Sequence, residues 1–488
     1  MKQAKIFDQR RCGILLHITS LPSANLGKDA YRFVDFLQQA GVTVWQMLPL
    51  GPTHSDGSPY QCLSAHAGNI RLISIEKIRN QPWCDADELP GGKISTQIAL
   101  AYRQFMAKAA EGLQQDFANF CEDQAYWLDD YVLFREIRHL QHSTAWFDWP
   151  AALRDRQPAA LAEIRQQRLE SLQIRRFEQF IFHSQWQALK TYANQRNVKL
   201  FGDMPIFVAH DSADVWANPK LFTLDKTGQP EKVAGVPPDY FSETGQRWGN
   251  PLYRWEQHID SDFAWWIQRL QTQLNSFDLI RIDHFRGFDA CWEIPASCDT
   301  AIEGHWVKAP GAALFTVLLS HFKELPVVAE DLGIITDEVN ALREQFAMPG
   351  MKILQFAFGG DASNPYLPHQ HSEDSVVYTG THDNNTTLGW YQALDEGAKN
   401  HLHQYVGPNN EEMPWLLNRL ALQSVSSLAV LPMQDVLALD ATHRMNVPGT
   451  TEDNWRWRFH WDMLPADCAE RLRHLNGLYG RLLINDTT

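Results

Sequence analysis

The residues most able to do chemistry lie in the stretch 279–287 of this 488-residue chain, directly after a short apolar run. Residues 279–282 are long enough for one buried strand, interrupted by Arg281, and Asp283 and His284 come directly after it. Side chains two positions apart on a strand point to the same face, so Arg281 and Asp283 should lie together. A buried ion pair that only stabilises the core is one interpretation. A functional pair is the other, because buried charge is costly.

Acidic residues occupy the same position on four predicted strands. Asp203, Asp283, Glu330 and Asp383 each follow the apolar part of a different strand. If the strands form a parallel barrel, these ends converge at its C-terminal mouth, where active sites are built. Like charges brought together raise one another's pKa and destabilise the fold. A shared functional site therefore explains the four acids better than four separate helix caps do.

Cleavage of an acetal is the chemistry that such a cluster suits. His17, His284 and His382 could converge on the mouth, but the sequence has no HExxH or Cys/His spacing, so no metal site is predicted. A serine nucleophile is not indicated either, because GxSxG is absent. A retaining enzyme needs a nucleophilic carboxylate and a protonated carboxylic acid roughly 5 Å apart. On this hypothesis Arg281 keeps Asp283 ionised, and burial raises the pKa of Glu330.

Eight short apolar runs predict the strands that would position these residues. They lie at 13–18, 42–48, 198–206, 279–282, 326–333, 351–356, 375–383 and 427–433. Helical spacing separates most of them, at 29–40, 263–274, 312–322 and 337–346. This order favours an α/β fold, a (β/α)₈ TIM barrel enlarged by insertions. A doubly wound open sheet is the alternative, but no GxGxxG follows the first strand.

Two insertions are expected within a single catalytic unit that spans residues 1–488. Residues 98–197 are almost wholly amphipathic and helical, which predicts a helical subdomain inserted at about 85–197. A second insertion, at about 207–260, is expected to carry active-site loops. The turn-rich segment 51–61 is expected at the rim of the barrel.

The composition limits the possible partners. The net charge is −15, which does not favour nucleic acid or an anionic membrane. Eighteen tryptophans would suit stacking against sugars, although many must be core residues. The seven cysteines show no metal spacing and are interpreted as free thiols in a reducing compartment. With no apolar region at the N-terminus, a cytoplasmic location is expected.

Three short motifs resemble the catalytic signatures of the α-amylase clan. These are RIDHFRG (281–287), AEDLG (329–333) and THDN (381–384). Longer stretches resemble the amylomaltases, which are 4-α-glucanotransferases also called disproportionating enzymes. They are GILLHITSLPS (13–23), SPYQ (58–61), GDMPIFVAHDSADVW (202–216), GVPPDYFSETGQRWGNPLY (235–253) and NWRWR (454–458).

The resemblance implies a role for each site residue. Asp283 would be the nucleophile, Glu330 the general acid/base and Asp383 the stabiliser of the transition state. The substrate-binding residues would be Arg281, His284, His382, Asp203, Tyr60, Ser58, Trp248 and Asn454. Residues 235–250 would form a mobile loop over the cleft, with glycines that permit motion.

The activity implied is transfer of a segment of an α-1,4-glucan to the 4-hydroxyl of another glucose or glucan. The partners would be α-1,4-glucans and malto-oligosaccharides in starch, glycogen or maltodextrin metabolism, and no cofactor is expected. Two alternatives remain open at this point. One is a plain α-glucan hydrolase or a phosphorolytic glucosidase, and the other is a non-catalytic sugar-binding barrel, which the presence of all three acids disfavours.

Overall fold

Eight parallel strands form the centre of the computed structural model, which describes residues 3–238 and 242–483. Among the described residues they are β1 (Arg11–Leu15), β2 (Val44–Gln46), β3 (Lys199–Pro205), β6 (Leu279–Asp283), β9 (Val327–Ala329), β10 (Gly350–Ile353), β11 (Ser375–Tyr378) and β12 (Leu428–Pro432). β12 pairs with β1, and the Ala329 N–H donates to the Pro349 carbonyl at 2.9 Å between β9 and β10. The predicted (β/α)₈ barrel is confirmed, and each predicted run overlaps one of these strands.

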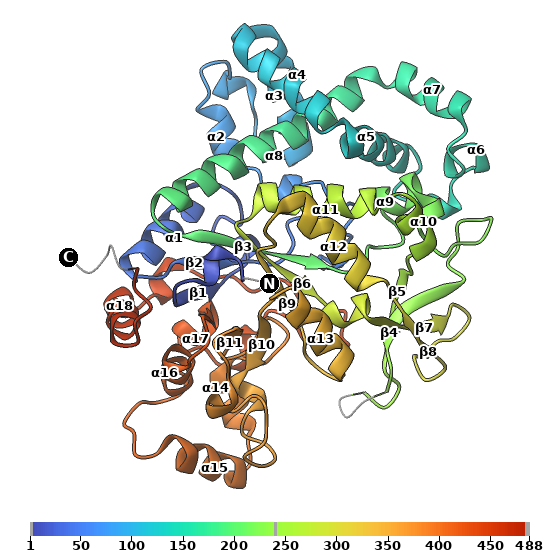
Figure 1. Cartoon of the computed structure of the whole chain (residues 1–488). Coiled ribbons are helices and arrows are strands. Elements are labelled where there is room, and N and C mark those ends of the chain that lie inside the picture. The colour runs from blue at the N-terminus through green and yellow to red at the C-terminus, as the bar shows by residue number, and fades with distance from the viewer. Residues whose placement is uncertain (1–2, 239–241, 484–488) are drawn as a thin grey trace.

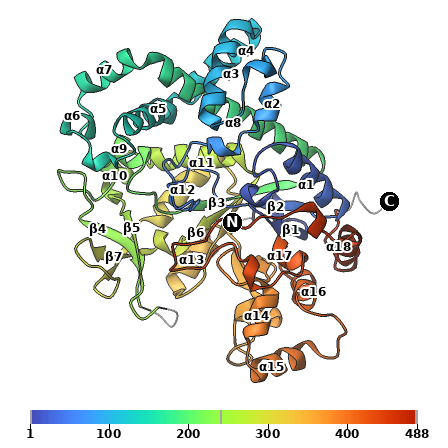
Figure 2. The same ribbon diagram turned by 180° about the vertical axis from the view of Figure 1, so that it is seen from behind.

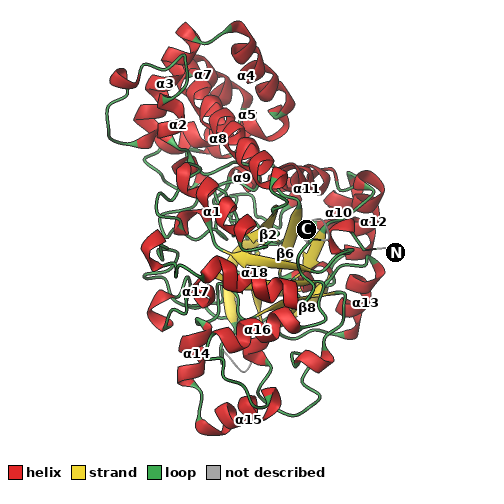
Figure 3. Cartoon of the chain, turned by 90° about the vertical axis from the view of Figure 1, so that its left-hand side faces the viewer, coloured by secondary structure: helices red, strands yellow, loops and turns green. Residues whose placement is uncertain are grey.

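Helices surround the barrel, as Figure 3 shows. They are α1 (Lys28–Gln39), α11 (Ala264–Ser276), α12 (Gly311–Phe322), α13 (Asp337–Gln345), α14 (Thr387–Ala393), α15 (Glu396–Val406), α16 (Trp415–Gln423), α17 (Met433–Val436) and α18 (Cys468–Leu478). Two shorter helices, α9 (Ala213–Ala217) and α10 (Trp255–Asp260), lie between β3 and β6. In the described part of the chain, no helix combines the length and the apolar character needed to cross a membrane.

A group of helices between β2 and β3 stands away from the barrel (Figures 1 and 2). It comprises α2 (Ile75–Arg79), α3 (Ile94–Lys108), α4 (Glu111–Asp123), α5 (Ala125–Leu140), α6 (Ala151–Arg154), α7 (Pro158–Gln167) and α8 (Leu169–Gln195). Aromatic rings fill its interior, where Phe105, Phe117 and Phe177 pack against one another. The 27-residue α8 leads directly into β3.

A second, antiparallel sheet was not predicted. Its strands are β4 (Lys232–Val236), β5 (Gln246–Pro251), β7 (Ala290–Pro295) and β8 (His305–Lys308), in the order β5-β4-β7-β8. β5 and β8 are short and largely polar, so they carry no apolar signal. Part of the predicted mobile loop at 235–250 lies in β4 and β5, and residues 239–241 lie outside the described residues.

Side chains alternate along the barrel strands, and this alternation determines which of them point into the barrel near its mouth. Leu279 packs inside the barrel, whereas Ile280 and Ile282 pack outside it against the helices. Arg281 and Asp283 share the inner face with Leu279 because side chains repeat every two residues. The same alternation places Asp203 two residues after the inner Phe201. The inner faces thus carry apolar side chains at the base and charged ones toward the mouth.

Two buried glutamines fasten α8 to the segment that follows β2. Gln179 accepts from the Gly68 N–H at 2.8 Å and donates to the Gly68 carbonyl at 3.0 Å. Gln185 makes the same pair of bonds with Ser74, at 2.8 and 3.0 Å. Each glutamine therefore satisfies two main-chain groups that are out of reach of water.

We predict that Gln179→Leu lowers the free energy of unfolding by about 1–3 kcal/mol, because the buried Gly68 N–H and carbonyl lose their partners. Urea denaturation followed by circular dichroism measures the change. Gln195→Leu is the matched control, since Gln195 is exposed at the end of the same helix. Equal stability losses in the two variants would contradict this account of how α8 docks.

Candidate active site

A buried arginine joins two of the four acids at the barrel mouth. Asp203 on β3 lies directly across from Arg281 on β6, and the Arg281 Nε donates to Asp203 Oδ1 at 3.0 Å. The Arg281 Nη2 donates to Asp283 Oδ1. Burial lowers the pKa of Arg281, but the carboxylates of Asp203 and Asp283 raise it well above its usual value. The guanidinium therefore stays charged between them.

Glu330 directly follows the neighbouring strand β9 and lies at the same level of the barrel as Asp283. Ile282 pairs with Ala329 in the sheet, so the next residue on each strand is one of these two acids. Glu330 Oε2 accepts from the His284 N–H at 2.7 Å, and Oε1 accepts from the Leu332 N–H at 2.9 Å. Two main-chain donors thus fix the carboxyl group next to Asp283.

Asp383 completes the group from the loop after β11. Its Oδ1 accepts from the Asn446 side-chain amide at 2.6 Å, and its Oδ2 lies 3.3 Å from His382 Nε2. The Asp383 side chain is 46% exposed and the Asp283 side chain 30% exposed, so both carboxylates are open to a ligand. The buried Arg281 and Asp203 lie behind them.

A cleft of about 430 Å³ brings the predicted residues together. Ser58, Tyr60, Trp248, Asp283, His284, Glu330, Asp383 and Asn454 all line it. Asp203, Arg281 and His382 do not line it, but each contacts a residue that does. All eleven sequence-predicted site residues are therefore at one place, contributed by segments from residue 58 to residue 454.

Burial raises the pKa of both inner acids. It raises the pKa of Glu330 despite the opposing effect of Arg281 and of the two main-chain donors. It also raises the pKa of Asp283 well above its usual value, in spite of Arg281 and with a further contribution from Asp203, Glu330 and Asp383. The prediction for Glu330 is confirmed. Arg281 opposes the rise in the pKa of Asp283, as the prediction requires, but burial and the three neighbouring carboxylates outweigh its effect.

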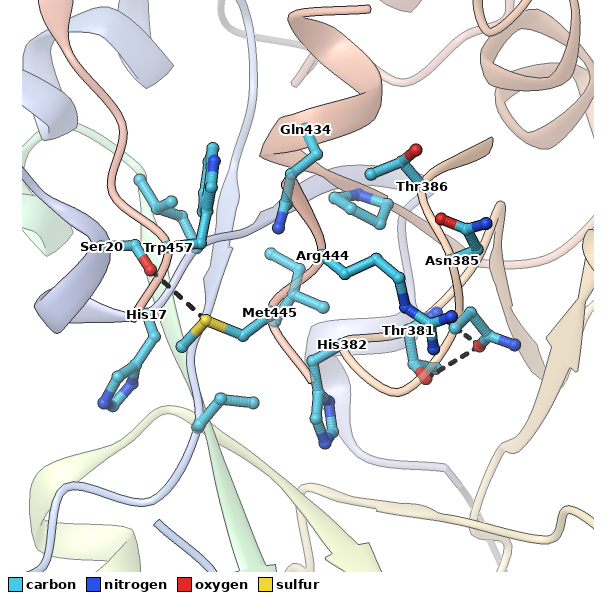
Figure 4. Close-up of a pocket in the computed structure, with 15 residues that line it drawn as sticks. His17, Ser20, Thr381, His382, Asn385, Thr386, Gln434, Arg444, Met445 and Trp457 are labelled. Atoms are coloured by element: carbon cyan, nitrogen blue, oxygen red, sulfur yellow. Dashed lines mark hydrogen bonds between the residues drawn. The ribbon is translucent and has the colours of Figure 1, made fainter. Parts of the chain in front are cut away.

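The histidines near the mouth are neutral. Burial, with a smaller effect from Arg286, lowers the pKa of His284 to about 3. Burial also lowers the pKa of His382, against the effect of Asp383. His17 does not join the cleft; it lines a separate 30 Å³ cavity behind His382, together with Arg444 and Met445 (Figure 4).

Aromatic rings shape the walls of the cleft. The Tyr60 hydroxyl donates to Asp203 at 2.6 Å, and its ring stacks on His382 with the centroids 5.3 Å apart. The Trp248 ring, on the unpredicted strand β5, meets the His284 ring edge-on at 4.7 Å. Tyr60 therefore serves both as a wall and as a donor to the charged group beneath it.

Asn454 holds its own loop together while it lines the cleft. Its Oδ1 accepts from the Val447 N–H at 2.9 Å, and its Nδ2 donates to the Thr450 carbonyl at 2.9 Å. The side chain is buried, and these bonds set the shape of the cleft wall at residues 448–451.

Several cleft residues were missed. Asp56, Gln246, Asn250, Asn446 and Trp455 line the cleft but were not predicted as site residues. Gln61 is another, although it ends the SPYQ motif and could have been found there. Asn446 has no local signal, because it lies 63 positions from the aspartate it contacts. Within the described ranges, no three His, Cys, Asp or Glu side chains gather as metal ligands would.

Comparisons with known proteins identify the family of this chain. The family described as 4-alpha-glucanotransferase matches residues 16–464. A 4-alpha-glucanotransferase of Thermus thermophilus is 47% identical over 487 residues, covering 95% of this chain and 97% of the relative. One of Synechocystis sp. is 46% identical over 500 residues, covering 98% and 99%.

A solved structure of the same family has a similar fold. An amylomaltase from Streptococcus agalactiae, in complex with acarbose, matches with a TM-score of 0.93 at 35% identity, covering 97% of this chain and all of that one. The chain therefore belongs to the 4-alpha-glucanotransferase family, the amylomaltases.

Proposed function

We propose that Asp283, Glu330 and Asp383 carry the 4-α-glucanotransferase reaction as a retaining double displacement on α-1,4-glucans. One observation supports this most: Asp283 and Glu330 leave adjacent strands at the same level and line one cleft, together with Asp383. A nucleophile and an acid on the two sides of one glycosidic bond are what such a reaction requires. The acarbose bound to the Streptococcus agalactiae amylomaltase supports an oligosaccharide as the occupant.

The first step forms a covalent intermediate. An Asp283 oxygen attacks C1 of a glucose unit, and the C1–O4 bond breaks as Glu330 donates its proton to the departing O4. Two coupled acids with raised pKa values share a proton. The direct contact with Arg281 favours the negative charge on Asp283, which leaves the proton on Glu330. Asp383 faces the same cleft and stabilises the positive charge that develops on the sugar ring.

The second step reverses the first with a new acceptor. Glu330, now ionised, takes the proton from the 4-hydroxyl of another glucan, whose oxygen attacks C1 and releases Asp283. Two inversions at C1 give net retention. Water would give hydrolysis by the same path, so transfer requires that the cleft favours a sugar. Trp248 and Tyr60 offer apolar surface on which a glucose ring can pack.

The remaining substrate contacts follow from the cleft. We propose that His284, His382, Ser58 and Asn454 position the glucan, while Arg281 and Asp203 act from behind the cleft. The neutral histidines can hydrogen-bond sugar hydroxyls without cancelling the charge of the acids.

We further propose that residues 1–488 form a single catalytic unit, with a helical insertion at about 85–197 and an active-site loop insertion at about 207–260 in the barrel. We also propose a cytoplasmic location, which the seven free cysteines support.

We predict that Asp283→Asn, Glu330→Gln and Asp383→Asn each reduce kcat for maltotriose by about 10³-fold or more while the fold persists. Chromatography by chain length measures the products, and circular dichroism checks the fold. Wild type should form glucose and longer oligomers, whereas a hydrolase would form no longer oligomers. Asp374→Asn, an exposed site, is the control. Retention of most turnover in any of the three variants would remove that residue from the mechanism.

We predict that Glu330→Gln is more thermostable than wild type at pH 7–8. The folded pKa of Glu330 is raised, so the wild type is stabilised by its neutral form at low pH and loses that stability as the pH rises through the folded pKa. The variant cannot ionise at this position, but its amide can accept only one of the two main-chain N–H bonds, so its Tm relative to that of wild type should fall as the pH falls toward about 4. Differential scanning fluorimetry across pH measures it, with the exposed Glu452→Gln as control. A difference in Tm that does not change with pH would contradict the burial argument.

We predict that Trp248→Ala increases the ratio of hydrolysis to transfer several-fold, because water gains access to the intermediate. Assays of reducing ends and of longer oligomers from maltotriose measure the two fates. Trp306→Ala is the matched control, since Trp306 lies on β8 of the same sheet and does not line the cleft. An unchanged ratio in Trp248→Ala would show that this ring does not exclude water.

A further inference from the structure

Both oxygens of the Asp383 carboxylate face a neutral side chain. The Asn446 Nδ2 donates to Oδ1 at 2.6 Å, and the His382 Nε2 lies 3.3 Å from Oδ2. Burial lowers the pKa of His382, so its ring carries no charge. Asp383 differs in this from Asp283, which is held by the guanidinium of Arg281.

Asn446 is itself held in place by a well-connected segment, residues 444–455. Next to it, the Arg444 Nη2 donates to the Asp383 main-chain carbonyl at 3.0 Å. The Met445 carbonyl accepts from the Trp455 N–H at 2.8 Å. On the other side of Asn446, the Val447 N–H donates to Asn454 Oδ1 at 2.9 Å, so the main chain on both sides of Asn446 is held by hydrogen bonds.

The loop that carries Asp383 is fixed from the other side as well. The Thr381 hydroxyl and N–H both donate to Asn384 Oδ1, at 2.9 Å each. Figure 4 shows the Arg444 side chain extending toward Thr381 at this turn, with His382 beside it. The aspartate is thus held through its main chain by Arg444 and through its side chain by Asn446.

We infer that Asn446 is a positioning residue for the transfer reaction, which orients the Asp383 carboxylate toward the sugar without neutralising it. The inference rests on the role proposed for Asp383. A lysine or arginine at position 446 would cancel the charge that the developing cation needs, whereas an amide fixes the carboxylate by one hydrogen bond. A carboxylate offers about four acceptor sites, so a sugar hydroxyl can still bind Asp383 beside Asn446.

The segment also connects this contact to the substrate. Pro448, Gly449, Thr450 and Thr451 line the cleft just after Asn446, so a glucan that packs on them contacts the loop holding Asp383. Asn446 is thereby placed to align the carboxylate in the glucan-bound enzyme, which predicts an effect on kcat larger than that on KM.

The test compares Asn446→Ala and Asn446→Asp in the full-length protein, by pH profiles of kcat and KM for maltotriose disproportionation. Asn446→Ala should reduce kcat at least 10-fold and change KM less than about three-fold. The acid limb of its pH profile, which is the fall of kcat at low pH, should occur at the same pH as in wild type. Asn446→Asp sets a second carboxyl against Asp383, so the two would share a proton, and the acid limb should move up by about one pH unit or more.

Two controls separate the possible outcomes. Asn409→Asp makes the same chemical change in an exposed loop, where the aspartate can still accept from the Glu411 N–H, and it should leave both limbs unchanged. A wild-type kcat in Asn446→Ala, or an acid limb in Asn446→Asp that matches wild type, would overturn the inference if Asp383→Asn is inactive. An active Asp383→Asn would instead overturn the role proposed for Asp383. If Asn446→Asp does not fold, the kcat of Asn446→Ala alone tests the inference.

Discussion

The site depends on one buried guanidinium. Arg281 stands on the inner face of the barrel and contacts Asp203 and Asp283 at once. Buried carboxylates at close range would otherwise repel one another and oppose folding. A buried ion pair of this kind adds little stability by itself. Its consequence is geometric, because it fixes two acids on neighbouring strands in defined positions.

Neutral groups make the remaining hydrogen bonds to the carboxylates. Main-chain N–H groups hold Glu330, the Tyr60 hydroxyl adds a bond to Asp203, and a side-chain amide holds Asp383. The mouth therefore keeps an excess of negative charge, at a cost in stability that the barrel and its helices offset. This is the arrangement expected where a positive charge must develop on a neutral sugar. The negative charge that the reaction needs at the barrel mouth therefore lowers the stability of the fold there.

The barrel and its acids could be predicted from the sequence because both follow local rules. Apolar runs of strand length predict β3, β6 and β9, and a period of two places Asp203 and Asp283 on the inner face. Trp248 was found only by resemblance, since its strand is polar and pairs with distant segments. No pattern in the sequence indicates Asn446 as a site residue, because only the fold brings it to Asp383. The direction of the Asp283 pKa could not be predicted either, since it depends on the burial and on three carboxylates brought together in space.

The central claim is that Asp283 forms the bond to the sugar and that Glu330 transfers the proton. Mass spectrometry of Glu330→Gln after exposure to an α-maltosyl fluoride tests this most directly. Fluoride leaves without an acid, while the missing base slows release, so a sugar ester should accumulate. We expect the added maltosyl mass on the peptide that contains Asp283. The same mass on a peptide without Asp283, or no adduct while the fluoride is still consumed, would contradict the account.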